Sequence, residues 1–418
     1  MDFKKYPSTR DSAPKTVERW LLGKRNDDGI DSNLWRVHDK LYNLEKFNHP
    51  GGKEWLDANK GTDITEAFEA HHINSEFVEK LLANYFVKNT ETPRNSPFTF
   101  EENGFYKTLK KRAAPVIKKH GSGPSTTMNL IMDSLVFSFI STWILTIYFQ
   151  NKYLAVLSGF FLNLVIICSH NYFHKKNNFR MFYFDLSMMS SSEWRVSHAI
   201  SHHLFPNTVA DIEVSALEPF LNFFPKEKSF FSKYFVILYS NLIYLIIFPQ
   251  QFIGRMIRTL LGTHKFELAN AIVIVELFIT MLFSSSILSG LWLWFLIHIS
   301  SSYFFSFIGL IAAHHHPDIW HHGDTLKYNS NDWGIRQIEA VRDRKDVTGN
   351  LFLVVTMFGD HTLHHLFPTV DHSKLKYLYP VLIETCKDFN IDFKFYSIFE
   401  LALGKYKQLA RSQPRQTA

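Results

Sequence analysis

The feature that most constrains this chain is a set of apolar runs, each about as long as a membrane-spanning helix. One of them, LIMDSLVFSFISTWILTIYF, begins at Leu130. A helix rises about 1.5 Å per residue, so about 20 apolar residues cross the hydrocarbon core of a bilayer. Five segments qualify by length: 128–149, 153–169, 234–253, 268–288 and 290–313. Residues 1–126 are polar and charged instead, so the sequence predicts a soluble part followed by a membrane body.

The composition agrees with this division and excludes other classes of protein. Hydrophobic residues make up 46% of the 418, and 40 residues are Phe, which is too apolar for an ordinary soluble enzyme. Cys168 and Cys386 are too few and too far apart to indicate a disulfide framework or a cysteine metal site. The net charge of +6 is modest, and no nucleic-acid partner is expected. The opening residues MDFKKYPSTRDSAPK contain no apolar run, so no cleavable signal peptide is expected.

Three short histidine clusters carry the chemistry of the membrane body. They are SHNYFH, VSHAISHH and HTLHH, which contain His170, His174, His198, His202, His203, His361, His364 and His365. At helical spacing, residues four apart stack on one face. One such cluster is most often a polar helix face, but three clusters that each adjoin an apolar segment favour a metal site. Eight imidazoles exceed what one zinc ion takes, and imidazole suits iron, so the clusters predict a two-metal iron site.

Convergence of these clusters restricts the topology. If the clusters form one site, they lie on the same side of the membrane. The second cluster precedes the third apolar segment and the third cluster follows the fifth, so the chain must cross the membrane an even number of times between these two clusters. We expect 234–253 to lie in the interface, because Pro249 and two glutamines interrupt it, which leaves four spanning helices plus interfacial helices. Lys and Arg are abundant in 99–126, in 171–233 and after 316. The positive-inside rule then places both termini and all the clusters on the cytoplasmic face.

The polar N-terminal part contains a second candidate site. A short strand pair in WRVH and KLYNL leads to the turn NHPGG, and helices follow in EWLDANKG and TEAFEAHH. His49 lies in the turn, and His71 and His72 end the second helix. Two opposed imidazoles hold a haem iron on both axial sides, which leaves no open position for O2 and favours electron transfer. The alternative is a turn histidine and a helix-terminal histidine with no ligand.

The residues around this pair resemble a known haem domain. VHDKLYNLEKFNHPGG followed by TDITEAFEAHH is similar to the cytochrome b5 domain, from about Trp20 to Phe98. The resemblance implies haem b with His49 and His72 as its axial ligands. It favours His72 over His71 because the ligand of fused b5 domains follows the Phe, here Phe68, by four residues.

The pattern H-x3-H, H-x3-HH and H-x2-HH, with paired membrane hairpins, resembles the membrane fatty-acid desaturase superfamily over residues 130–390. The resemblance implies a diiron centre that activates O2 and takes electrons from the b5 haem, which an NADH-cytochrome b5 reductase reduces. It assigns the eight clustered histidines as ligands and adds a ninth, for which His314 is the best candidate and His316 the next. A long-chain fatty-acyl lipid is the implied substrate, and no catalytic residue is expected beyond the metal ligands.

Several residues modify this interpretation. The third cluster begins with His361 where front-end desaturases commonly have Gln, and the second cluster has one residue more than the usual H-x2-HH of fused members. Asp360 and Asp371 are candidates to orient imidazoles. His321 and its neighbour are expected to face water.

The expected fold is therefore multidomain, an α+β cytochrome b5-like haem domain followed by an all-α membrane desaturase-type helical domain. Its parts are a flexible arm at 1–18, the haem domain at 19–98, a basic linker at 99–126, the membrane domain at 127–404 and a flexible tail at 405–418. The linker is expected to lie against anionic headgroups. The expected activity is desaturation of an acyl chain in the endoplasmic reticulum membrane. The alternatives are a hydroxylase of the same diiron class and a non-enzymatic membrane haem electron carrier.

Overall fold

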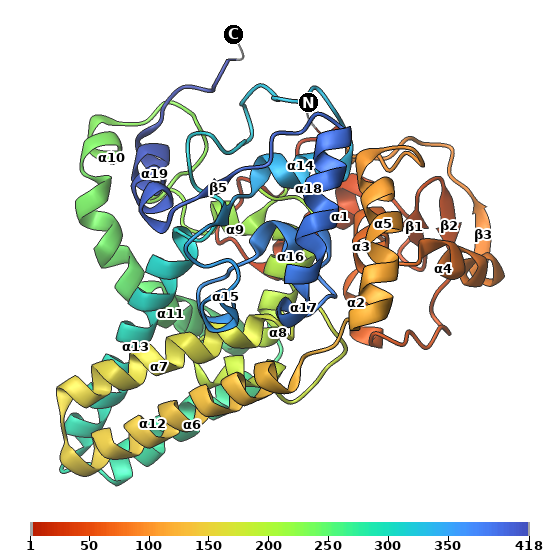
Figure 1. The fold of residues 1–418 in the computed structure, drawn as a ribbon. Coiled ribbons are helices and arrows are strands. Elements are labelled where there is room, and N and C mark those ends of the chain that lie inside the picture. Colours follow the sequence, from red (N-terminus) through yellow and green to blue (C-terminus); the bar gives the residue numbers. More distant parts are fainter. Residues whose placement is uncertain (1–2, 417–418) are drawn as a thin grey trace.

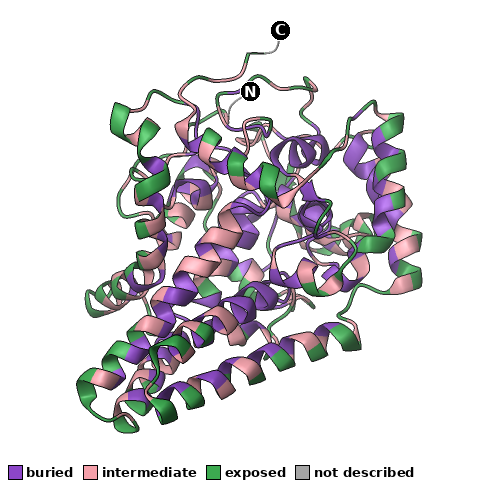
Figure 2. Ribbon diagram, turned by 60° about the vertical axis from the view of Figure 1, so that its left-hand side comes forward, coloured by how far each residue is buried: buried purple, intermediate pink, exposed green. Residues whose placement is uncertain are grey.

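Four helices run side by side at one end of the molecule (Figure 1). They are α6 (Thr126–Phe149), α7 (Lys152–His170), α12 (Leu268–Leu282) and α13 (Ile287–Leu310). The indole Nε1 of Trp143 in α6 donates to the Thr280 hydroxyl of α12 at 3.0 Å, which ties the first hairpin to the second. Exposed residues follow the outer faces of this bundle in Figure 2. Phe137 and Phe278 are among the exposed large apolar side chains, as expected for contact with lipid. The computed structural model describes residues 3–416.

A fifth apolar helix, α11 (Val236–Leu260), runs at an angle to this bundle (Figure 1). Among the described residues, α6, α7, α11 and α13 are the helices long and apolar enough to cross a membrane, whereas α12 has only 15 residues. The expected span 268–288 is therefore shorter than predicted. Length and composition select α11 in its place, but the contacts at the ends of α11 argue otherwise.

Both ends of α11 are tied to loops on the histidine side of the bundle. Near its start, the Tyr239 hydroxyl donates to the carbonyl of Phe220 at 2.9 Å. Near its end, the guanidinium groups of Arg255 and Arg258 bond the carboxylate of Glu193 at 2.8 and 2.5 Å. Since Glu193 directly precedes the second histidine cluster, α11 begins and ends on one side of the bundle. This arrangement supports the predicted place of α11 in the membrane interface.

The prediction that Pro249 ends this segment is wrong, because α11 continues through it to Leu260. Proline has no N–H and its ring crowds the preceding turn, which normally breaks a helix. Here the Ser302 hydroxyl of α13 enters that turn. It accepts from the N–H of Phe248 at 3.1 Å and donates to the carbonyl of Tyr244 at 2.6 Å. Ser302 thereby satisfies the N–H and the carbonyl of the turn next to the proline, as a helix in an apolar setting requires.

The N-terminal domain has the predicted strand pair followed by two helices. A three-stranded antiparallel sheet contains β1 (Trp35–Val37), β2 (Lys40–Tyr42) and β3 (Phe86–Asn89). Four helical segments accompany it: α2 (Lys53–Ala58), α3 (Thr65–His71), α4 (Ser75–Leu82) and η1 (Ala83–Tyr85). Trp35, Leu56 and Phe68 are buried between sheet and helices. The turn with His49 precedes α2, and α3 ends at His71 and His72, so these elements carry the histidines of the candidate haem site.

A histidine-rich body lies between this domain and the bundle. Its helical segments are η2 (Met181–Leu186), α8 (Ser191–Trp194), η3 (Arg195–His202), α9 (Ile212–Ser215), α10 (Phe230–Tyr234), α14 (Trp333–Ala340), α15 (Leu351–Thr356), α16 (His361–Leu366), α17 (His372–Leu375), η4 (Lys376–Leu378) and α18 (Tyr379–Asp388). Two short strands, β4 (Asp343–Arg344) and β5 (Phe395–Tyr396), pair in parallel. These short elements position the histidine clusters.

The basic linker forms a helix, α5 (Phe105–His120), that holds the haem domain against the body. Lys107 and Lys110 bond the two carboxylate oxygens of the fully buried Glu69 of α3 at 2.8 and 3.0 Å. The Tyr106 hydroxyl donates to the carbonyl of Leu366 in α16 at 2.9 Å. The prediction that the linker lies against lipid headgroups is therefore wrong for these two lysines, because they neutralise a carboxylate at the domain contact.

The variant Glu69→Gln is expected to lower the free energy of unfolding by about 3 kcal/mol, because it removes the fully buried carboxylate that Lys107 and Lys110 share. Burial alone would raise the pKa of Glu69, but His38, Lys110 and Lys107 together lower it to about 2. The stabilisation is therefore present above the ordinary pKa of 4.5 and is lost as the pH falls towards 2. Thermal unfolding measures the change. The exposed Glu76, paired with Lys80 at 2.8 Å, is the matched control, and a Glu76→Gln shift of equal size would contradict the assignment.

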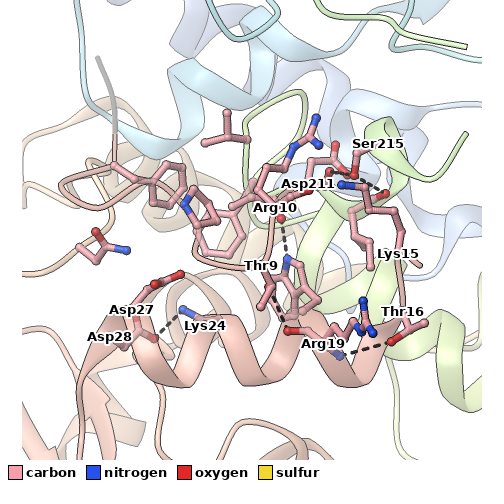
Figure 3. Close-up of a pocket in the computed structure, with 18 of the residues that line it drawn as sticks. Thr9, Arg10, Lys15, Thr16, Arg19, Lys24, Asp27, Asp28, Asp211 and Ser215 are labelled. Carbon is pink, nitrogen blue, oxygen red and sulfur yellow. Dashed lines mark hydrogen bonds and ion pairs between the residues drawn. The ribbon is translucent and has the colours of Figure 1, made fainter. Parts of the chain in front are cut away.

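Both ends of the chain pack against the body where the structure describes them. Arg10 is buried and bonds both carboxylate oxygens of Glu218 at 2.8 and 3.0 Å. Thr16 caps the first helix, α1 (Val17–Asp28), by accepting from the N–H of Arg19 (Figure 3). The last helix, α19 (Ile398–Ala410), crosses the expected boundary at 404, and Arg411 behind it pairs with Asp324 at 2.7 Å. The predictions of a flexible arm at 1–18 and a flexible tail at 405–418 do not hold, although residues 1–2 and 417–418 lie outside the described part.

Candidate haem and metal sites

The structure brings all nine histidines predicted as metal ligands into two adjacent buried groups. The first contains His170, His174, His198, His203 and His364, and the second contains His202, His314, His361 and His365. Within each group the candidate ligand atoms lie within 4.8 Å of one another. The members come from the end of α7, from η3, from the segment after α13 and from α16. A two-metal site therefore has a complete set of imidazoles for each ion.

The second cluster owes its arrangement to a π-helix, η3. The N–H of His203 bonds the carbonyl of His198, five residues earlier, at 2.9 Å. A single added residue commonly turns an α-helix into a π-helix at a functional site. The added residue noted in H-x3-HH is accommodated in this way, because His198 and His203 reach the first group while His202 reaches the second.

The second group presents nitrogen lone pairs to a common point. The Nδ1 atom of His202 donates to Asp211 at 2.9 Å, and that of His314 donates to the carbonyl of Ala340 at 3.0 Å. In the neutral form that binds metal, rings held in this way direct their Nε2 lone pairs at each other across 3.1 Å. Two lone pairs repel unless a cation lies between them. A metal-bound histidine typically donates its other ring N–H to a carboxylate or a backbone carbonyl, as His202 and His314 do here. These residues therefore fit a metal ion.

The first group shows the same features. The Nδ1 atom of His198 lies 3.1 Å from the Glu213 carboxylate, and its Nε2 atom lies 2.7 Å from that of His170. The Nε2 atom of His364 lies 3.0 Å from that of His170. Both ring nitrogens of His174 are buried without a hydrogen-bond partner in residues 3–416. An ion among these rings would satisfy nitrogens that the protein leaves unbonded.

Burial keeps most of these rings neutral, which is the form that binds metal. It lowers the pKa well below the usual value for His174, His198, His203, His314, His361, His364 and His365. His202 differs: burial opposes its charge, but Asp211 and Glu213 raise its pKa above the usual value. The carboxylate contact that raises this pKa also fixes which nitrogen faces the site.

The structure separates the alternatives left open by the sequence. His314 lies in the second group, whereas His316 lies outside both groups and accepts from the N–H of Asp318. The prediction that His321 faces water is wrong, because that side chain is fully buried. Asp360 bonds the Tyr379 hydroxyl at 3.0 Å, so that contact does not orient an imidazole.

Sequence reasoning missed the groups that hold the rings in place. They are Asp211, Glu213 and Gln337, and Gln337 accepts from the Nδ1 atom of His365 at 3.0 Å. The acidic residues of DIEVS follow the second cluster closely and could have been noticed. Gln337 has no such signal, because α14 reaches the site only through the fold.

The candidate haem site has His49 and His72 facing each other, with ring centres 5.9 Å apart. Their Nδ1 atoms donate to the carbonyls of Gly52 at 3.3 Å and Phe68 at 2.9 Å, which leaves both Nε2 lone pairs free for a metal. Two metal bonds of about 2 Å on opposite sides of one iron would place the ring centres roughly 6 Å apart. The pair therefore fits bis-imidazole ligation. His71 contacts the ring of Trp55 instead, so the structure places His72 opposite His49.

A cavity of about 210 Å³ opens onto both metal groups. Its walls include His198 of the first group and His202, His314 and His361 of the second. Apolar side chains from several elements line the remainder, among them Trp194, Val214, Ile247, Phe305, Leu310 and Phe358. An apolar cavity with a few convergent polar groups is typical of a small-molecule site.

Comparison with known proteins agrees with this division. The family model "Fatty acid desaturase" matches residues 150–397, and "Cytochrome b5-like Heme/Steroid binding domain" matches residues 20–90. The "Cytochrome b5-related protein" of Drosophila melanogaster is 39% identical over 422 residues, covering 99% of this chain and 96% of that protein. "Delta(5) fatty acid desaturase A" of Dictyostelium discoideum is 23% identical, covering 93% and 92%. "Acyl-lipid (8-3)-desaturase" of Mortierella alpina is 21% identical, covering 90% and 92%. No solved structure matches.

These matches confirm both resemblances seen in the sequence and the multidomain fold class. The b5-like domain implies haem, and the desaturase domain with its histidine groups indicates iron, a lipid substrate and a membrane setting. The chain therefore belongs to the fatty acid desaturase family, as an integral membrane member that carries a cytochrome b5-like domain at its N-terminal end.

Proposed function

We propose that the chain is a fatty-acyl desaturase that uses O2 and receives electrons through its own b5 haem at a diiron centre held by nine histidines. The observation that carries the proposal is that both complete histidine groups border one apolar cavity. An acyl chain lying in that cavity would bring a methylene beside the metals. An iron pair would supply the oxidising power to take hydrogen from an unactivated methylene, which no side chain can do.

The protein's own residues would prepare this site in three ways. Asp211, Glu213 and Gln337 hold the imidazoles through their Nδ1 atoms, which directs the Nε2 atoms inward. The apolar walls, including Trp194 and Phe305, exclude water and guide the acyl chain. No other side chain is required as an acid or base, because the ligand field carries the reactivity.

Electrons would enter at the N-terminal domain. His49 and His72 would both hold the haem iron, which would let the haem exchange electrons without binding O2. We propose an NADH-cytochrome b5 reductase as the donor, with each NADH supplying the two electrons that one O2 activation needs besides those from the substrate.

Expression of the chain in a host cell, with mass spectrometry of its fatty acids, tests this function. We expect acyl products two hydrogens lighter than their precursors. The matched variant His361→Ala should give none, because it removes a ligand from the second group. Products one oxygen heavier would establish hydroxylation instead. A lipid profile unchanged from that of the empty host, with the metals bound, would contradict both reactions.

We also propose that the protein lies in the endoplasmic reticulum membrane with both termini and the active site on the cytoplasmic side. Two hairpins, α6–α7 and α12–α13, return the chain to the same side, and α11 begins and ends there. Accessibility labels placed near residues 180, 330 and 410 are expected to react only from the cytoplasm. A label near 220 on one side and another near 330 on the opposite side would contradict the arrangement.

A further inference from the structure

His71 occupies the contact between the haem domain and the metal-binding body. Its Nδ1 atom donates to the carbonyl of Ala67 at 2.9 Å, which fixes the ring at the end of α3. The ring lies 5.4 Å from that of Trp55 on the haem side and 6.2 Å from that of His174 in the first histidine group. Its Nε2 atom is buried and has no hydrogen-bond partner in the described chain. His71 itself has so far been assigned no role in either site, although His174 belongs to the first histidine group.

Two further contacts beside His71 show that the haem domain and the body pack closely at this point. The Thr369 hydroxyl, which follows the third histidine cluster, lies 3.5 Å from the carbonyl oxygen of His71. The guanidinium of Arg195, in the π-helix, lies 4.9 Å over the ring of Trp55. The haem domain therefore meets the segments of the second and third histidine clusters around His71. His71 also directly precedes His72 in the chain.

His71 does not share the position of the metal ligands. It is absent from the five-histidine group, whose candidate ligand atoms all lie within 4.8 Å of one another. It also does not face His49, since that place is taken by His72. The imidazole lies between the two sites without belonging to either.

We propose that His71 is the bridge through which electrons pass from the haem to the metal pair. Electron tunnelling slows exponentially with the gap between donor and acceptor. The His71 ring, which precedes His72 in the chain and lies 6.2 Å from the ring of His174, shortens the gap between the haem ligand and the first histidine group. Each transfer oxidises one ferrous haem to ferric haem and reduces one ferric iron of the pair to ferrous iron. One electron moves, no bond forms or breaks, and the reductase replaces the electron. The inference rests on the proposed diiron function.

The test follows the haem alone and needs no substrate. In the purified full-length protein under nitrogen, a flavin photoreductant excited by a light flash donates one electron to the ferric haem, and the decay of ferrous haem absorbance reports transfer to the ferric pair. The variant His71→Ala opens a gap and should slow this decay severalfold. The variant His71→Phe refills the gap with a ring and should decay at nearly the wild-type rate. Both should keep the wild-type haem spectrum and non-haem iron content.

A matched control separates the bridge from general loosening of the contact. Thr369→Ala removes a side chain at the same place and should leave the decay unchanged. Decay in His71→Ala as fast as in the wild type would overturn the bridge, and so would decay in His71→Phe as slow as in His71→Ala. Loss of haem or of non-haem iron in either variant would also overturn it, because His71 would then act as a ligand.

The failure of the proposed function would look different. His202→Ala, which should lack the metal pair, is expected to show no decay of the ferrous haem under nitrogen. If the wild type shows no more decay than this variant, electrons do not reach the pair and the proposed function fails. If the wild type decays rapidly and His71→Ala matches it, only the bridge fails.

Discussion

Replacement of His202 with Ala is expected to remove most of the non-haem iron and all turnover while leaving the haem spectrum unchanged. His202 belongs to the four-histidine group, and Asp211 holds its ring in place at 2.9 Å. Loss of one ligand leaves three imidazoles around a metal that needs more. The haem site lies in another domain, so its absorbance should not respond. Metal analysis of the purified chain, set beside haem absorbance, measures both, and the wild type should carry about two non-haem irons per haem.

His316 supplies the control for this prediction. It lies close in sequence to His314 but outside both groups, and its ring packs beside Gly404 instead. His316→Ala should therefore keep its non-haem iron. Stoichiometric zinc in the wild type, or a folded wild type without any non-haem metal, would remove desaturation and hydroxylation together and leave the haem carrier as the remaining function.

Replacement of His49 with Ala is expected to have the converse effect. The protein should lose its low-spin haem spectrum and its NADH-dependent turnover, because one axial side of the haem has no ligand. The histidine groups of the body do not include His49, so the non-haem iron should stay. Absorbance, iron analysis and product formation with reductase and NADH measure the three quantities.

The neighbouring pair of histidines gives a discriminating comparison. His72→Ala should reproduce the loss of haem, since His72 faces His49 at 5.9 Å, whereas His71→Ala should retain the low-spin spectrum. A His71 variant without haem, beside a His72 variant that keeps it, would reverse the ligand assignment. A colourless wild type after haem supplementation would remove the electron-entry site altogether.

The sequence predicted the elements whose signals are local. The strand pair before NHPGG, the two helices after it and the apolar segments are each encoded by their own residues. The histidine groups were also predictable, because all nine members lie in short motifs. The division of these nine histidines into two groups could not be predicted from the sequence. His202 lies in the second group, apart from His198 and His203, because the added residue of the π-helix η3 changes the direction of the side chains.

Other features arise only when distant segments meet. Lys107 and Lys110 look like ordinary surface charges in the sequence, and only the fold shows that Glu69 lies buried against them. Pro249 is a residue that usually breaks a helix, yet the Ser302 hydroxyl of another helix bonds backbone groups of the turn before it, and the helix continues. Arg10 lies in a segment of low hydrophobicity, but its partner Glu218 is far along the chain. In each case the deciding group is remote in sequence.

Under the proposed function, the buried contact of Glu69 with Lys107 and Lys110 would also set the kinetics of electron delivery from the haem to the metals. A separate electron carrier must find its acceptor by diffusion for every electron, so its rate rises with concentration and falls with ionic strength. Here the donor domain is held by charges that are buried and therefore weakly screened by salt. Delivery becomes a first-order step within one polypeptide. Under the proposed function, the step from the haem to the metals would then have the same rate whether the membrane holds few copies of the protein or many.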